Sequence, residues 1–475
     1  MVWSHPGARL PSSRALADQL GVSRLTAVLA LEQLAAEGYI TTRVGVGTFV
    51  NRELPDTDAL APATPTVPLI QHPNLSERGL RLSRTPRIIT KIDGPPRAFR
   101  VGTPALDRFP ITLWNRLISR HTRRLTAAQL DYSGTAGLPA LREAIAAHVS
   151  RSRGTSCSAN QVIVVAGAQQ GLDMIANLLL DPGEVAWMEE PGYPGARAAL
   201  IAAGARIEPM PVDEQGLMIE PSTSHARPAR IVFTTPSHQF PLGVPMSLPR
   251  RLALLRWARD AHAWVVEDDY DSEFRYGSRA IPCLHGLDTD GRVIYIGSFS
   301  KTLFPGLRLG YLIVPPDLQG PLAHARLASD IHPQTFLQGV VVDLIGEGHY
   351  ERHLRRMTLE YRARPHSLEE ALRRYCHGAL ELRPVTTGLH AAADLLMGVD
   401  ALVSREAFAR GIEAMPLSAY YSKHTASSAN GLLLGFGSVP PKVVTESVKR
   451  LAAAVESVTR PPHRSSDAAA RAVIP

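Results

Sequence analysis

The sequence predicts two folded parts: a small N-terminal helix-turn-helix with a β-hairpin, and a large doubly wound α/β domain that continues into a smaller α+β subdomain. Three observations predict this arrangement. Residues 1–52 contain two short, capped helical patterns and a glycine-rich hairpin, and from about Thr85 short apolar runs alternate with amphipathic stretches. After about His332 long helical stretches give way to short strands. Strands that alternate with helices are typical of a largely parallel sheet covered on both faces.

The domain boundaries follow changes in composition. Residues 1–52 form the first module, and residues 53–84, which include the Pro-, Ala- and Thr-rich stretch "LPDTDALAPATPTVPLIQHP", form a linker. Residues 85–460 form the large domain, of which about 333–460 is the small subdomain. Residues 461–475 offer little apolar surface to bury, so they are expected to be a disordered tail.

Composition and charge favour a soluble, cytoplasmic protein. The chain has 475 residues, and its net charge of +7 is compatible with a nucleic-acid partner. Cys157, Cys283 and Cys376 lie far apart and form no C-x-x-C pair, so neither a disulfide framework nor a metal site is expected. The start, "MVWSHPGARL", lacks the apolar core of a signal peptide, and no apolar run approaches the length of a membrane span.

Within the first module, the pattern predicts two helices and a wing. Ser12 or Ser13 can cap a first helix that Gly21 ends, and Ser23 can cap a second helix that Gly38 ends. The segments "YITT" and "TFV" on either side of "RVGVG" predict a β-hairpin with a glycine turn. Together these elements predict a winged helix-turn-helix.

The same module has side chains suited to DNA. Arg24 lies at the N-terminal end of the second helix, the end that usually enters the major groove, where arginine contacts guanine or phosphate. Arg14 on the first helix and Arg43 in the wing add expected backbone contacts, which orient a protein on the duplex. The predicted DNA-binding residues are Arg14, Ser23, Arg24 and Arg43.

The segments "RLPSSRALADQLGVSR", "EQLAAEGYI" and "GVGTFV" resemble the winged helix of GntR-type bacterial transcription regulators. In that family another helix precedes this pattern, whereas only "MVWSHPGA" precedes it here, so the resemblance implies a winged helix without its first helix. Three explanations stay open: the true start lies upstream, a partner supplies the cover, or DNA binding is impaired.

In the large domain, Lys301 in "GSFSKTLFPGLRLGYL" is the first candidate for chemistry. The chain has only five lysines among 51 basic residues, and Lys301 stands alone between Lys91 and Lys423. An amine can lose its proton and attack a carbonyl, which a guanidinium cannot do. Lys301 follows the strand candidate "VIYIGS", at the carboxyl end where α/β sheets place their ligands. It is therefore a candidate Schiff-base lysine, and an ordinary surface lysine is the alternative.

Residues near this lysine predict a phosphate-bearing aldehyde as cofactor. Ser298, Ser300 and Arg308 supply hydroxyls and a guanidinium for a phosphate dianion. In "AGAQQGLD" a strand turns into a helix, so the backbone N–H groups of Ala168 and Gln169 are placed to meet a phosphate at a helix N-terminus. An aldehyde-trapping amine beside a phosphate cradle indicates pyridoxal phosphate.

Three more side chains fit that cofactor. Asp268 in "VVEDDYDSEF" can pair with the pyridinium nitrogen, and Tyr270, two residues on, projects from the same side of the chain toward the phenolic oxygen. Tyr193 in "EEPGYPGA" follows another strand and can stack on the ring. Each has a structural alternative: a core aromatic for Tyr193, a helix cap for Asp268 and a surface charge for Arg308. Four loops at four strand ends favour one shared site.

The segments "YSGTAGLPALREAIAAHV", "VAGAQQGLD", "EEPGYPG" and "GSFSKTLFPGLRLGY" resemble fold-type I aminotransferases. "TPSHQFPLG" and "EDDYDSEF" resemble in particular the MocR subfamily, in which a GntR winged helix is fused to an aminotransferase-like domain. The resemblance implies a homodimer whose linker carries each winged helix to the partner. It also implies residue roles: a Schiff base at Lys301, contacts to the pyridine nitrogen and phenolic oxygen from Asp268 and Tyr270, stacking by Tyr193, and phosphate binding by Arg308.

Two departures from the wider aminotransferase pattern bear on the ligand. Phe240 stands where many members have the asparagine of "NPTG", as in the MocR pattern. Ser438, after "LLLGFG", stands where the resemblance places the arginine for an α-carboxylate. Arg197 or Lys423 could substitute, but nothing in the sequence places either residue there. The departure at Ser438 weakens the case for an ordinary amino-acid substrate or effector.

The favoured interpretation is a homodimeric regulator that binds a double-stranded DNA operator and senses pyridoxal phosphate, or its adduct with an amine or amino-acid effector. The alternative is a working aminotransferase with a vestigial N-terminal segment. The short winged helix favours the enzyme, and Ser438 favours the regulator.

Overall fold

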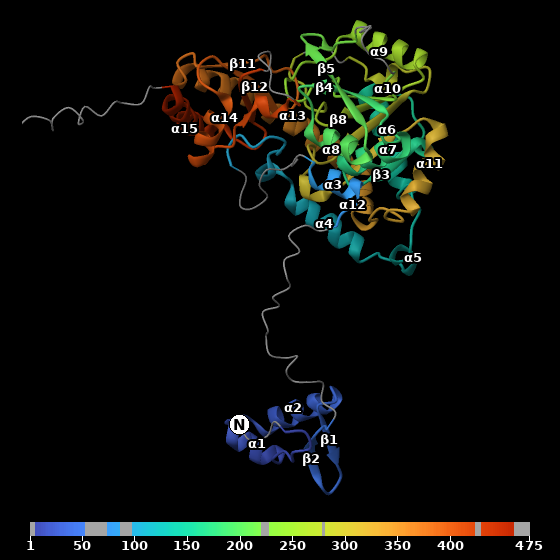
Figure 1. The fold of residues 1–475 in the computed structure, drawn as a ribbon, viewed down its shortest axis with the longest axis vertical. Helices are drawn as coiled ribbons and strands as arrows, with labels where there is room; N and C mark the ends of the chain where they lie inside the picture. Colours follow the sequence, from blue (N-terminus) through green and yellow to red (C-terminus); the bar gives the residue numbers. More distant parts are fainter. Residues whose placement is uncertain are drawn as a thin grey trace, which may run out of the picture. The chain divides into compact units, whose positions relative to one another are not determined.

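The computed structural model describes residues 5–52, 74–85, 97–219, 228–277, 281–422 and 429–459. Two compact units make up the chain, Met1–Asn74 and Leu75–Pro475 (Figure 1). Each unit is described below by itself. The predicted tail, 461–475, and residues 53–73 of the predicted linker lie outside the described residues.

The N-terminal unit has the predicted helix-turn-helix and hairpin. Its elements are α1 (Ser13–Leu20), α2 (Arg24–Ala36), β1 (Ile40–Arg43) and β2 (Gly47–Val50). The Oγ of Ser12 accepts a hydrogen bond from the Ala15 N–H at 3.3 Å, so Ser12, not Ser13, caps α1. The Oγ of Ser23 accepts from the Thr26 N–H at 3.1 Å and caps α2. The two strands pair antiparallel, which confirms the wing.

The second unit is built on an eight-stranded sheet. Its strands are β3 (Val162–Val165), β4 (Val185–Glu190), β5 (Arg206–Asp213), β6 (Gly216–Leu217), β7 (Ile231–Thr234), β8 (Trp264–Asp269), β9 (Val293–Ser298) and β10 (Gly310–Ile313). They lie in the order β3-β10-β9-β8-β7-β4-β5-β6. Neighbours from β9 to β5 are parallel, while β10 is antiparallel to both of its neighbours and β6 is antiparallel to β5. The strands β3, β9, β8, β7 and β4 therefore end at the same edge.

Helices cover both faces of this sheet (Figure 1). Alternate strand residues belong to different core clusters: Ile163 and Val165 pack with the helices of one face, and Val162 and Val164 with those of the other. One face carries α7 (Ala168–Leu179), α8 (Pro194–Ala203) and α11 (Pro316–Leu327). The opposite face carries α4 (Ile111–Thr122), α6 (Pro139–Arg153), α9 (Leu248–Asp260), α10 (Leu284–Leu287), α12 (Phe336–Gly346) and the first half of α13 (His349–Tyr375).

A smaller antiparallel sheet forms the C-terminal subdomain. Its strands are β11 (Leu380–Leu382), β12 (His390–Leu395), β13 (Met415–Pro416) and β14 (Gly431–Gly435), in the order β11-β12-β14-β13. Helices α14 (Asp400–Ala409) and α15 (Pro441–Thr459) and the second half of α13 pack against it in one apolar core. The predicted α+β subdomain is therefore present.

Two predicted boundaries differ from the structure. Within the predicted linker, 53–84, a helix α3 (Glu77–Ser83) forms and contacts α8, and the guanidinium of Arg78 donates to Asn177 at 2.8 Å. A helix this short has too few apolar positions to show periodicity in the sequence. The small subdomain does not begin at 333, because α12 and the first half of α13 pack in the core of the large domain. One helix spans both cores, and helical periodicity does not show which core a turn joins.

No helix among the described residues is long and apolar enough to cross a membrane.

Candidate functional site

The residues singled out in the sequence gather at one edge of the large sheet. Lys301 follows β9, Asp268 lies at the end of β8, Ala168 begins α7 just after β3, and Tyr193 precedes α8 just after β4. Because these strands are parallel to one another, their carboxyl ends meet at this edge. The topology thus brings four separate sequence segments together.

Lys301 has a confined amine. Its Nζ donates a hydrogen bond to the carbonyl of Gly102 at 2.9 Å. Burial lowers the pKa of this amine, which the negative charges of Asp271 and Asp268 oppose. A lowered pKa increases the fraction of neutral amine, which is the form that attacks a carbonyl.

Asp268 carries a carboxylate with a free acceptor atom. Its side chain is buried, and among the described residues its Oδ1 has no hydrogen-bond partner. Burial, followed by repulsion from Asp269, raises its pKa to about 7. An unpartnered buried oxygen is costly unless a ligand satisfies it. This oxygen fits a protonated ring nitrogen.

Burial of the Asp268 carboxylate lowers the stability of the cofactor-free protein in a pH-dependent way, which can be tested. Since the folded pKa of Asp268, about 7, lies above the ordinary carboxyl value, folding takes up a proton between these two values and the free energy of unfolding falls as pH rises through that window. In cofactor-free protein, the Asp268→Asn variant removes this loss. We expect the stability gain of the variant over wild type to grow by about 2–3 kcal/mol between pH 5 and pH 8, measured by urea unfolding. The exposed Asp260→Asn change is the control, and a gain independent of pH would contradict the assignment.

A cradle of groups suited to phosphate forms where α7 begins. Gly167 has φ 91° and caps α7 without a side chain, so the first N–H groups of the helix, including those of Ala168 and Gln169, face outward. The guanidinium of Arg308 donates to the Ala166 carbonyl at 2.7 Å, and a Cβ on Gly167 would lie 3.1 Å from it. Phosphate groups are typically bound by an arginine guanidinium together with the backbone N–H groups at a glycine-capped helix N-terminus.

Ser298 ends β9, and Ser300 lies between this strand and Lys301. The Oγ of Ser298 accepts a hydrogen bond from the Ser300 N–H at 3.1 Å, which orders the turn after β9. Ser300 is buried and Ser298 half-buried.

Tyr193 lies beside the cradle as the residue before α8. Burial raises the pKa of its phenol, and the charges of Asp268 and Arg308 also act on it. The ring is 5.6 Å from that of Phe240. The amide nitrogen of Gln169 donates to the Gly195 carbonyl at 3.0 Å and joins α7 to α8 next to this tyrosine.

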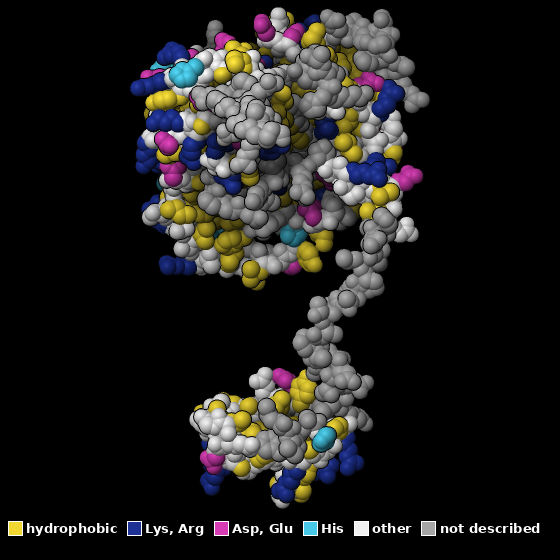
Figure 2. All heavy atoms as spheres, turned by 60° about the vertical axis from the view of Figure 1, so that its left-hand side comes forward, with side chains coloured by type: hydrophobic (Ala, Val, Ile, Leu, Met, Phe, Trp, Pro, Cys, Tyr) yellow, Lys and Arg dark blue, Asp and Glu magenta, His cyan; other side chains and the backbone are white. Residues whose placement is uncertain are grey.

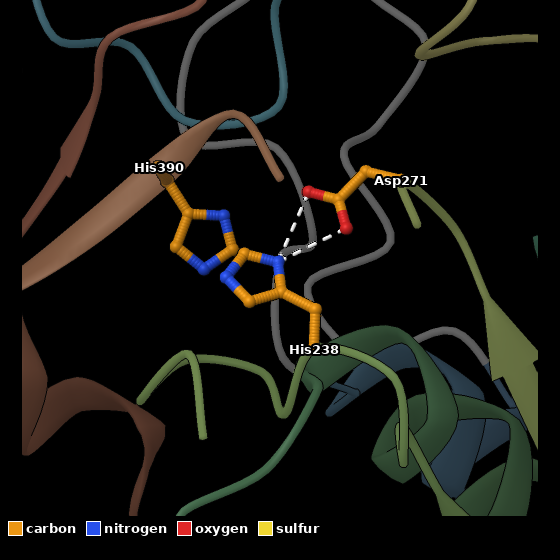
Figure 3. A group of neighbouring side chains, drawn as sticks. All are labelled: His238, Asp271 and His390. Atoms are coloured by element: carbon orange, nitrogen blue, oxygen red, sulfur yellow. Dashed lines mark hydrogen bonds and ion pairs between the residues drawn. The ribbon is translucent and has the colours of Figure 1, made fainter. Parts of the chain in front are cut away.

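Tyr270 contacts His238, a partner that the sequence did not indicate, and its expected contact with the phenolic oxygen of the cofactor stays a prediction. Its hydroxyl donates to the carbonyl of His238 at 2.9 Å and lies 3.1 Å from Nδ1 of the same histidine. His238 Nδ1 also lies 3.0 Å from Asp271, and its ring stacks on His390 at 4.5 Å between ring centroids (Figure 3). None of these three residues was among the predicted site residues. His238 lies in the quoted "TPSHQFPLG" and Asp271 in "EDDYDSEF", but no motif marked His390.

His238, Asp271 and His390 are buried, and their donor atoms lie within 4.8 Å of one another, which is a grouping able to hold a metal ion. The two rings are stacked with their planes 29° apart. Imidazole lone pairs lie in the ring plane, so stacked rings do not direct them at a common point. Asp271 also accepts a hydrogen bond from the Leu389 N–H at 3.1 Å. We therefore treat this group as a hydrogen-bonded network.

The wall that the small subdomain adds to the site is apolar. Ser438 comes after the end of β14, so it is not the strand residue that faces the site. Leu433 is that residue: it is buried in a cluster with Phe240, whereas Leu432 and Leu434 point to the other face of the sheet. Arg197 is held by Glu190 at 2.8 Å. Lys423 lies outside the described residues.

The N-terminal unit presents its predicted DNA-binding residues to solvent. Arg14, Ser23, Arg24 and Arg43 are all exposed, and Figure 2 shows basic side chains on the surface of this unit. Arg24 is the first residue of α2, and the Arg43 guanidinium lies 5.9 Å from the centre of the Phe49 ring.

Each of the two units matches a known protein family. Residues 4–50 match the family of bacterial regulatory proteins of the gntR type, and residues 116–394, more than half of the chain, match aminotransferase class I and II. The chain is 39% identical over 448 residues to a probable rhizopine catabolism regulatory protein, MocR, of Rhizobium meliloti, covering 94% of this chain and 89% of that one. This chain belongs to the MocR family of GntR-type regulators.

Other relatives of this MocR-family chain agree. It is 33% identical to a pyridoxine biosynthesis transcriptional regulator, PdxR, of Corynebacterium glutamicum, over 91% of this chain and 88% of the relative. Its second unit is similar to a kynurenine aminotransferase of Pyrococcus horikoshii (TM-score 0.70, 27% identity, 77% of this chain and 91% of that one). It is likewise similar to a multiple substrate aminotransferase of Thermococcus profundus (TM-score 0.71, 28% identity, 81% and 97%).

These findings make the MocR-family chain a transcription regulator with an aminotransferase-like domain, and they indicate pyridoxal phosphate as its cofactor. The residues at the sheet edge fit that cofactor: an amine of lowered pKa at Lys301, an unpartnered carboxylate oxygen at Asp268, and a glycine-capped helix beside Arg308.

Proposed function

We propose that this regulator changes its affinity for operator DNA when pyridoxal phosphate, alone or joined to an amine, occupies the site around Lys301. The observation that carries the proposal is the joining in one chain of a helix-turn-helix unit and a half-buried lysine whose charge acts on Asp268, an aspartate whose Oδ1 has no hydrogen-bond partner among the described residues. When bound, the cofactor supplies an electrophilic carbon for amines. Lys301 holds it covalently, Asp268 holds its ring nitrogen, Tyr193 stacks on its ring, and Arg308 and the start of α7 hold its phosphate.

Sensing requires two states with different affinities for DNA. The protein acts as a homodimer, whose two α2 helices read two half-sites of one operator. The DNA-contacting residues are Arg14, Ser23, Arg24 and Arg43. Cofactor or amine binding shifts the distance between these helices.

The direct test is binding of the full-length chain to the DNA upstream of its own gene, with and without pyridoxal phosphate. Titration at two salt concentrations separates phosphate contacts, which weaken steeply with salt, from base contacts. Specific binding that changes with the cofactor supports the proposal. Specific binding that is identical with and without cofactor would refute it.

A single arginine tests the DNA-contacting surface. Arg24→Ala is expected to weaken operator binding by about 1–3 kcal/mol if it contacts a base, or to reduce the salt slope by about one charge if it contacts phosphate. Fluorescence anisotropy with the operator measures both quantities. Arg373→Ala, an exposed arginine of α13 in the second unit, is the matched control and should change neither. Equal effects of the two variants would mean that net charge alone drives binding.

Aminotransferase activity is a second candidate function. It is favoured by the presence of both Lys301 and Asp268, and by the similarity of the second unit to aminotransferases. Single-turnover conversion of the bound cofactor to its amine form by an amino donor would support it. The apolar wall at Leu433 argues against α-amino acids as donors.

A further inference from the structure

His390 is a polar side chain of the small subdomain that lies among the apolar residues of this wall, against His238 and Phe240. It is the first residue of β12 and is 2% exposed. Its ring lies 4.5 Å from His238, 5.4 Å from Phe240 and 6.2 Å from Tyr270, between centroids. The charge of Lys301 also acts on it. The ring therefore lies beside Tyr270 and Phe240, on the side of the candidate site that the small subdomain forms.

One nitrogen of this ring has no partner. Among the described residues, Nε2 of His390 is buried without a hydrogen bond. The ring also interacts with the carbonyl of Pro241, which requires an N–H donor, so we assign the proton to Nδ1. Burial and the neighbouring charges of His238 and Lys301 keep the pKa of His390 well below its ordinary value. In the neutral ring Nε2 is therefore an acceptor only.

The surroundings of this acceptor are apolar on the side of the small subdomain. The cluster next to Phe240 contains Leu433 of β14, Ala392 of β12 and Tyr420. Among these described residues a carboxylate would meet hydrocarbon and a lone pair, and none of them offers a charge to compensate for its lost hydration. The nearby guanidinium of Arg197 is already paired with Glu190.

We infer that the amine sensed at Lys301 carries a neutral hydrogen-bond donor, such as a hydroxyl, rather than a carboxylate, and that Nε2 of His390 accepts the hydrogen bond from this group. The inference rests on the proposed function and names the class of its effector. A hydroxyl satisfies the buried acceptor, and the rest of the molecule contacts Phe240 and Leu433.

A matched pair of probes tests this: 4-aminobutan-1-ol and 4-aminobutanoate, which differ only in the terminal group. Full-length protein loaded with pyridoxal phosphate is titrated with each while the absorbance of the cofactor is followed. Wild type should respond to the amino alcohol at about tenfold lower concentration, the size of one satisfied buried hydrogen bond. His390→Phe should remove this preference, and His390→Gln, which keeps an acceptor oxygen, should retain part of it.

Leu433→Arg gives an independent test, because it places a cation on the same wall and should shift the preference toward 4-aminobutanoate. Cofactor absorbance and circular dichroism report whether each variant is folded and loaded. The inference is overturned if loaded wild type prefers the amino acid, responds to neither probe, or keeps its preference in His390→Phe. Failure of wild type to take up the cofactor at all would instead refute the proposed function, together with this inference.

Discussion

Replacing Lys301 with alanine is expected to abolish covalent attachment of pyridoxal phosphate and, with it, the response of DNA binding to the cofactor. Lys301 supplies a confined amine with a lowered pKa at the sheet edge, hydrogen-bonded only 2.9 Å from the Gly102 carbonyl. The alanine side chain has no amine, so the aldehyde of the cofactor has no group with which to form a covalent bond at this position. Borohydride reduction followed by mass measurement of the protein detects the attachment, and operator titration detects the response.

Two variants test whether the effect of Lys301→Ala comes from loss of the amine, from loss of its charge, or from loss of any lysine. Lys301→Arg keeps a cation but cannot form the bond, so it should also fail to attach cofactor. Lys449→Ala removes an exposed lysine of α15 and should behave as wild type. Persistence of the reduced adduct in Lys301→Ala would show that another residue carries the cofactor.

Replacing Arg153 with methionine is expected to destabilise the second unit by about 3–5 kcal/mol. Arg153 ends α6, and its guanidinium lies 2.8 Å from Asp269 and 3.0 Å from Glu273. Although burial acts in the opposite direction, Arg153 holds the pKa of Asp269 below its ordinary value. Methionine keeps the volume but leaves the buried carboxylate of Asp269 and the half-buried carboxylate of Glu273 without this cation. Urea unfolding monitored by circular dichroism measures the loss.

Matched variants identify the cause of that loss. Arg259→Met breaks an exposed ion pair with Asp260 and should leave stability nearly unchanged. The double variant Arg153→Met with Asp269→Asn should recover part of the stability, because it removes one of the unpaired charges. Equal instability of the single and double variants would mean that lost packing, not charge, causes the effect.

Much of the candidate site could be predicted from the sequence. Lys301, Asp268 and the start of α7 each lie at or just after the end of an apolar strand pattern, and parallel strands bring such ends to one edge. Arg308 reaches the same edge because it precedes β10, which runs antiparallel to its neighbours. Residue chemistry and strand direction are both visible in the sequence. The hydrogen bond from the Tyr270 hydroxyl to the carbonyl of His238, a residue 32 positions earlier, was not visible there.

The sequence by itself determined the two-unit organisation, the α/β class and the chemical types gathered at the sheet edge, because local periodicity, caps and motifs encode them. Only the tertiary structure decided the wall of the site. His390 and Leu433 lie on strands of the small subdomain, and they meet Phe240 of the large domain through packing between segments far apart in the chain. Which face of a buried strand points at a ligand depends on that packing, since both faces of β14 are leucine and no alternation distinguishes them.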